Sequence, residues 1–201
     1  KAQTQSFSGI AAFGTGGTGL ACGTEPQKVN AAVVSPEFFN VMGVNPVYGR
    51  MLGEDDLKAP DVIVLSYELW KRQFGANPNI VGQSPKLDGG SYAIVGVAPE
   101  GFSYPEKTQV WAPLVITTKP TISRDGHFLK IVARLKPGVT VEQAQSEMNT
   151  VAARLEQQYP ATNKDLGTRV VSMHEHAVSK VKTALVILVI CSISLVGFGM
   201  V

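Results

Sequence analysis

The stretch Val34–Arg50, VSPEFFNVMGVNPVYGR, carries the most complete local structural signal in the sequence. Ser35 occupies the position of a helix N-cap, and Pro36 suits the first helical position, where its missing amide hydrogen is not needed. Apolar side chains follow on one helical face, at Phe38, Val41 and Met42. Gly43 suits a left-handed helix end. The stretch therefore predicts a short helix that begins and ends sharply.

Extended segments flank this helix on both sides. Lys28–Val34 alternates loosely as a strand, and Val44–Arg50 is expected to return as another. The three parts together predict a β–α–β unit. Gly43 and Gly49 are interpreted as residues required by backbone geometry. Arg50 either forms a pair across a junction between subdomains or lies solvated on the surface.

The same arrangement recurs nearer the C-terminus. Alternation in His127–Leu135 predicts a strand with its apolar side chains on one face. Thr140 and Gln143 form a capping box for a helix that ends before Pro160. The apolar positions of this helix are Val141, Ala144, Met148, Val151 and Leu155. Thr168–Met173 is expected to return as a strand and complete a second β–α–β unit.

Short β signals fill the section between the two units. Asp61–Ser66, DVIVLS, predicts a strand, and Ser66 is placed to cap a helix over Tyr67–Phe74. Asp88-Gly89-Gly90 is a hairpin turn signal rather than a calcium loop. Trp70 and Phe74 are expected in the core. Trp111 is expected either in the core or on a contact surface.

These signals predict an α+β fold in which two β–α–β units form one body, with helices over one face of a mixed sheet. A β-rich subdomain is expected as an insertion in that body, and two successive domains are the alternative. The predicted parts are a glycine-rich segment at 1–28, the body at 29–50 and 127–176, the inserted subdomain at 51–126, and a truncated transmembrane helix at 184–201.

The two terminal segments have distinct compositions. The glycines of Ser6–Gly23 predict a flexible loop, and the absence of a G-K-[ST] ending argues against a phosphate-binding loop. Ala184–Val201, ALVILVICSISLVGFGMV, has 18 residues without a charge, close to the roughly 20 residues that span a bilayer. A buried core helix is the alternative. We expect the chain, which starts at Lys1, to be a piece of a longer polypeptide.

The sequence offers few candidates for chemistry. His174-Glu175-His176 has the spacing of two metal ligands on a strand, but no third ligand is identifiable. Glu54-Asp55-Asp56 is interpreted as a loop of solvated carboxylates. Ser35 and Ser66 are interpreted as helix caps, since neither lies in a G-x-S-x-G motif. We therefore expect no catalytic, cofactor-binding or metal-binding residues and no cofactor. The net charge of +2 gives no support for nucleic-acid binding.

Three motifs in series carry a family resemblance: VSPEFFNVMGVNPVYGR, then VIVLSYELWKRQFGANPNIVGQSPKLDGGSYAIVGVAPEGFSYP, and later LKPGVTVEQAQSEMNTVAARLEQQYP. In this order they resemble the MacB-like periplasmic core domain of ABC-type permeases, in its acidobacterial-type form. The resemblance covers the chain from about Val29 to the C-terminus. Its specificity lies in the order of the motifs, because each motif alone is only a turn or cap signal.

The resemblance implies a porter-like body with an inserted subdomain, lying on the periplasmic side of the bacterial inner (cell) membrane between transmembrane helices. It implies a separate ABC nucleotide-binding domain that hydrolyses ATP, contact with membrane lipid, and a homodimer or permease pair. A periplasmic adaptor is a further candidate partner. Lys180 and Lys182 oppose this orientation, because lysines beside an apolar run favour the cytoplasmic side.

The function implied is the transmission of ATP-driven motion across the membrane to export or extract a substrate. Two alternatives come from other classes. A membrane-anchored extracytoplasmic hydrolase would require serine, histidine and carboxylate groups to converge, and its histidine would come from His127, His174 or His176. A passive partner-binding or assembly domain would show no response to nucleotide.

Overall fold

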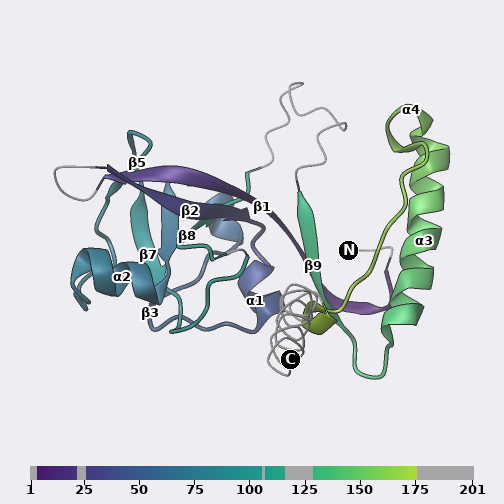
Figure 1. Cartoon of the computed structure of the whole chain (residues 1–201), viewed down its shortest axis with the longest axis horizontal. Helices are drawn as coiled ribbons and strands as arrows, with labels where there is room; N and C mark the ends of the chain where they lie inside the picture. Colours follow the sequence, from purple (N-terminus) through teal and green to yellow (C-terminus); the bar gives the residue numbers. More distant parts are fainter. Residues whose placement is uncertain (1–3, 22–25, 106, 116–128, 176–201) are drawn as a thin grey trace, which may run out of the picture. The chain divides into compact units, whose positions relative to one another are not determined.

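The computed structural model describes residues 4–21, 26–105, 107–115 and 129–175 (Figure 1). The chain divides into two compact units, Lys1–Lys136 and Pro137–Val201, here called unit 1 and unit 2. The predicted division into a glycine-rich segment, a body, an insertion and a membrane helix stays a prediction.

Unit 1 contains a mixed sheet of nine strands in its described residues, in the order β3-β7-β4-β8-β2-β1-β5-β6, with β9 also paired to β1. β2–β8 and β4–β7 are parallel, and the other pairs are antiparallel. The strands are β1 Phe7–Ala21, β2 Pro26–Val34, β3 Tyr48–Gly49, β4 Val62–Leu65, β5 Lys86–Leu87, β6 Gly90–Ser91, β7 Ala93–Val97, β8 Val110–Pro113 and β9 Lys130–Leu135. The predicted α+β class with a mixed sheet is confirmed.

Two short helices of unit 1 pack on opposite faces of this sheet. α1 is Phe38–Met42 and α2 is Tyr67–Phe74, with a 3-10 turn η1 at Glu54–Leu57 between them. Along β4, Val64 belongs to the apolar cluster that contains α1, whereas Ile63 and Leu65 belong to the cluster that contains α2. Successive side chains of a strand point to opposite faces. The expectation of helices over one face is therefore wrong for unit 1.

The glycine-rich segment is a strand, so the predicted flexible loop is wrong for its described residues. β1 pairs with β2 from Phe13↔Val34 to Ala21↔Pro26 and with β9 along its first half. Glycine has no side chain to show the alternation of a strand. The partner of the first half of β1 is β9, which lies far along the chain, so that pairing cannot be predicted from local sequence.

Ser35 does not cap α1, because the helix begins later, after Glu37. The Ser35 hydroxyl accepts a hydrogen bond of 3.0 Å from the Ala12 amide, and the Ser35 amide donates to the Ala12 carbonyl at 2.9 Å. Ser35 thus prolongs the pairing between β1 and β2. The predicted helix end is confirmed, with Gly43 at a φ of 71° in the left-handed region.

The helix predicted over residues 67–74 is confirmed as α2. Ser66 caps it by accepting a 3.2 Å hydrogen bond from the Leu69 amide, and Gly75 ends it at a φ of 61°. Trp70 and Trp111 are both buried. The alternative that placed Trp111 on a contact surface is therefore wrong.

Unit 2 is built on α3 (Val141–Gln158) and the short α4 (Pro160–Asn163). The predicted capping box of Thr140 and Gln143 is confirmed by hydrogen bonds of 3.2 and 2.9 Å. Residues 168–172 form no strand, so the predicted return strand is wrong and the second β–α–β unit is incomplete in the described residues. The backbone there is bound instead by the side chain of Gln145.

No helix within the described ranges is long and apolar enough to span a membrane. The predicted transmembrane helix at 184–201 lies outside the described residues. His127 and His176 lie outside them as well.

Candidate functional site

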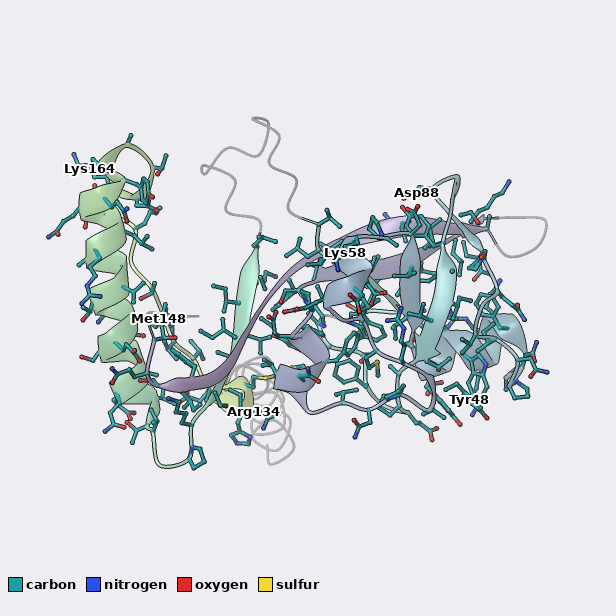
Figure 2. All side chains as sticks on the ribbon, turned by 180° about the vertical axis from the view of Figure 1, so that it is seen from behind. Tyr48, Lys58, Asp88, Arg134, Met148 and Lys164 are labelled. Atoms are coloured by element: carbon teal, nitrogen blue, oxygen red, sulfur yellow. The ribbon has the colours of Figure 1, made fainter. Side chains whose placement is uncertain are left out.

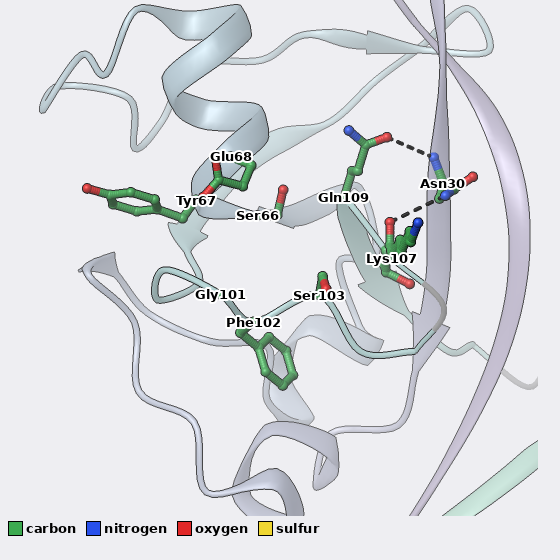
Figure 3. Close-up of a pocket in the computed structure, with 10 residues that line it drawn as sticks. Asn30, Ser66, Tyr67, Glu68, Gly101, Phe102, Ser103, Lys107 and Gln109 are labelled. Carbon is green, nitrogen blue, oxygen red and sulfur yellow. Dashed lines mark hydrogen bonds between the residues drawn. The ribbon is translucent and has the colours of Figure 1, made fainter. Parts of the chain in front are cut away.

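A cavity of about 350 Å³ opens in unit 1 where α2 begins (Figure 3). Its walls come from the start of α2, from β2, and from the loop between β7 and β8. The lining residues that carry polar side chains into this space include Asn30, Ser66, Ser103, Lys107 and Gln109. Phe102 also lines the cavity, and its ring stacks on Trp111 of the core.

Hydrogen bonds tie the wall of the cavity to the sheet. The Gln109 side-chain oxygen accepts a 3.3 Å hydrogen bond from the backbone amide of Asn30. The Asn30 side chain donates a second hydrogen bond of 3.3 Å to the Lys107 carbonyl. Ser66 is buried, and its amide donates to the Gln109 carbonyl at 2.8 Å. The hydroxyl, carboxamide and ammonium groups there are capable of hydrogen bonding to a polar group. Local sequence contained no signal for this site, because its residues come from three separate segments.

Arg50 and Asp56 form a bidentate ion pair. Both guanidinium nitrogens of Arg50 donate to the Asp56 carboxylate, at 2.7 and 2.6 Å, and the Gly53 amide donates to it at 2.8 Å. The hydrogen bond from Arg50 lowers the pKa of Asp56, although burial opposes the shift. The prediction of solvated carboxylates therefore holds for Glu54 and Asp55, which are exposed, and is wrong for Asp56, which is buried.

We expect Asp56→Asn to lower the free energy of unfolding by about 2 kcal/mol at neutral pH, because bonds to charged groups are lost. The pKa of Asp56 is lower in the folded state, so its carboxylate stabilises the fold above the unfolded pKa. That contribution is lost as the pH falls through the folded value. The difference in free energy of unfolding between wild type and variant should therefore narrow as the pH falls below 3.8, the ordinary pKa of an aspartate. Urea unfolding across this range measures it.

Asp55→Asn is the matched control, because Asp55 is exposed and lies 3.5 Å from Lys58. It should change the free energy of unfolding by less than about 0.5 kcal/mol. A difference between Asp56→Asn and wild type that stays constant on acidification would show that the charge of Asp56 does not stabilise the fold.

The hairpin turn predicted at Asp88 is confirmed between β5 and β6. The Asp88 carboxylate also accepts a 2.7 Å hydrogen bond from the Thr18 hydroxyl and another of 2.7 Å from the Gly19 amide. Both hydrogen bonds lower the pKa of Asp88, and the bond from Thr18 has the larger effect. The turn residue therefore also fastens the hairpin to β1, a role that the sequence did not indicate.

The candidate metal motif is only partly described. His174 is exposed and lies in a helical turn at residues 173–175, so its predicted place on a strand is wrong. Among the described residues, no three histidine, cysteine or acidic side chains are grouped closely enough to hold a metal ion.

Comparison with known proteins gives a family and several relatives. The model of the MacB-like periplasmic core domain matches residues 1–151. The macrolide export ATP-binding/permease protein MacB of Burkholderia thailandensis is 28% identical over 116 residues, which cover 55% of this chain and 18% of that protein. MacB of Burkholderia pseudomallei (strain K96243) is 27% identical over 126 residues, which cover 60% of this chain and 19% of that protein. The chain thus spans less than a fifth of these relatives.

Two solved structures share the fold. The periplasmic region of MacB from Actinobacillus actinomycetemcomitans aligns with a TM-score of 0.60 at 18% identity, covering 81% of this chain and 72% of that one. The extracellular domain of the noncanonic ABC-type transporter YknZ from Gram-positive bacteria aligns with a TM-score of 0.58 at 14% identity, covering 77% and 78%. With the family model matched over residues 1–151, the chain belongs to the MacB-like periplasmic core domain family.

Proposed function

We propose that this chain is the extracytoplasmic domain of an ABC-type permease and that it transmits ATP-driven motion across the membrane to export or extract a substrate. The observation that carries the proposal is the family match over residues 1–151. The MacB relatives of Burkholderia are described as ATP-binding/permease proteins. ATP hydrolysis would take place in a separate nucleotide-binding domain, so the domain itself would be no enzyme.

The architecture of unit 1 suits a part that moves as a whole. β1 has 15 residues, which is roughly 50 Å of extended backbone, and Figure 2 shows it as one continuous ribbon. It pairs with β9 near its start and with β5 at its end. A displacement applied at β9 would therefore reach the β5–β6 hairpin through a single hydrogen-bonded strand, without crossing a loop.

The proposal includes a location and partners. The domain would face the periplasm from the bacterial inner membrane, and residues 184–201 would contact lipid as the start of a transmembrane helix. The permease would act as a homodimer or as a pair of permeases, together with an ABC nucleotide-binding domain. A periplasmic adaptor is the further partner that this arrangement would accommodate.

Lysine cross-linking of the full-length permease with its ATP-binding component tests the proposal. Lys71 on α2 and Lys164 after α4 are exposed and report on unit 1 and unit 2. We expect the cross-links from these lysines to other parts of the assembly to differ between the nucleotide-free state and the state trapped with ATP and vanadate. Mass spectrometry of the cross-linked peptides measures the difference.

Cross-links within unit 1, such as those between Lys71 and Lys86, are the internal control, because both lysines lie in unit 1, whose strands form one sheet. A second control uses an ATP-binding component that cannot bind nucleotide. If the component hydrolyses ATP while every cross-link from the domain stays the same, the domain does not receive the motion, and a passive binding role would replace the proposal.

A further inference from the structure

Residues 164–172 of unit 2 are held along α3 by side chains, and we call this segment the strap. The Gln145 carboxamide accepts a 2.7 Å hydrogen bond from the Val170 amide and donates one of 2.8 Å to the Thr168 carbonyl. It thereby satisfies the two backbone groups on either side of Arg169, as a residue of a neighbouring strand would. The Asn149 side chain accepts the second hydrogen of the Gln145 amide at 2.7 Å.

A second, weaker attachment lies at the start of the strap. The Asp165 amide donates a 3.2 Å hydrogen bond to the Glu156 carboxylate. Both attachments use side chains on α3 rather than a backbone ladder. A side-chain attachment can break without disturbing the hydrogen bonds of the helix that carries it.

The attached position leaves groups of the strap poorly satisfied. Leu166 and Val171 are 43% and 39% exposed, so their burial in the attached position is incomplete. The Thr168 hydroxyl is buried without a hydrogen-bond partner among the described residues, which costs free energy. Val170 and Val171 also favour a strand, which is why the sequence predicted one here. The attached state is therefore opposed by the unpaired Thr168 hydroxyl and by the strand preference of the two valines, and it buries Leu166 and Val171 only in part.

We propose that the strap is a releasable element, that Gln145 is the residue that holds it closed, and that it opens in one nucleotide state of the permease. The strap is the covalent connection between α3 and the residues that lead to the apolar run at 184–201. Any motion passed along the chain between that run and α3 has to go through it. This role rests on the proposed function, because it requires motion of the domain driven by ATP.

Hydrogen exchange of the full-length permease with its ATP-binding component, in lipid nanodiscs, tests the strap. In the wild type, we expect peptides covering residues 164–172 to exchange about tenfold faster in one nucleotide state than in the other. Gln145→Ala should make them exchange fast in both states. Gln145→Glu should give an intermediate rate, because its carboxylate can still accept from the Val170 amide but cannot donate to the Thr168 carbonyl. Peptides from the middle of α3 should stay protected in all variants.

Gln157→Ala is the matched control, because Gln157 is exposed on the same helix, and it should behave as the wild type. Two results would overturn the proposal that the strap is released. One is unchanged protection of residues 164–172 from hydrogen exchange in Gln145→Ala. The other is equal protection of these residues in both nucleotide states while other parts of the domain respond. If no part of the domain responds to nucleotide, the proposed function fails and the strap's role fails with it. The exchange data therefore separate the two failures.

Discussion

Gly96→Ala is expected to prevent stable folding of unit 1, with a loss of roughly 3–5 kcal/mol in the free energy of unfolding. A Cβ atom at Gly96 would lie 2.0 Å from the Arg50 carbonyl oxygen and 3.1 Å from that of Tyr48. Both atoms belong to backbone. The Arg50 amide also donates a 2.9 Å hydrogen bond to the Val95 carbonyl, so the backbone at Arg50 cannot move away without breaking the pairing of β3 with β7.

Gly53→Ala is the control for this substitution. Gly53 has an extended backbone with a φ of −140°, and no heavy atom lies within 4 Å of a Cβ placed there. The control should unfold close to the wild type in urea, whereas Gly96→Ala should express poorly or unfold at much lower denaturant. Equal unfolding midpoints for the two variants would mean that β3 and β7 do not approach as closely as described.

Trp111→Ala is expected to cost about 3–5 kcal/mol of the free energy of unfolding, because it leaves a large cavity in the core. Trp111 is fully buried, and its ring centroid lies 5.9 Å from that of Phe39 and 5.4 Å from that of Phe102. Its indole N–H donates a 3.0 Å hydrogen bond to the Tyr104 carbonyl. Urea unfolding followed by circular dichroism measures the loss.

Trp111→Phe separates the two contributions of this side chain. It keeps an aromatic ring in the core but leaves the Tyr104 carbonyl without its donor, so an intermediate loss is expected. Ile131→Ala serves as the surface control, since Ile131 is 66% exposed, and it should change stability by less than about 0.5 kcal/mol. A Trp111→Ala variant as stable as this control would place Trp111 outside the core.

Local signals predicted the elements whose ends depend on neighbouring residues. α2 begins at the Ser66 cap and ends at Gly75, and α3 begins at its capping box, as expected from sequence. The hairpin turn at Asp88 was predicted for the same reason. In each case the decisive hydrogen bonds and dihedral angles involve residues a few positions apart.

The candidate site was much harder to predict than these elements. Its cavity is lined by residues from β2, from the start of α2 and from the loop before β8, which lie together only in the folded sheet. For Arg50 the sequence left two alternatives, a pair across a subdomain junction or a solvated position, and it did not identify Asp56 as the partner. The geometry around the Gly53 amide selects Asp56.

By itself, the sequence determined the class of fold, the capped helices α2 and α3, the hairpin turn and the family, because these depend on local spacing and on the order of motifs. Only the tertiary structure decided that the glycine-rich segment is strand β1, that α1 and α2 lie on opposite faces, and that residues 168–172 are bound by Gln145. The physical reason is common to all three. Hydrogen-bond and packing partners distant in sequence select among backbone conformations that local propensity leaves nearly equal in free energy.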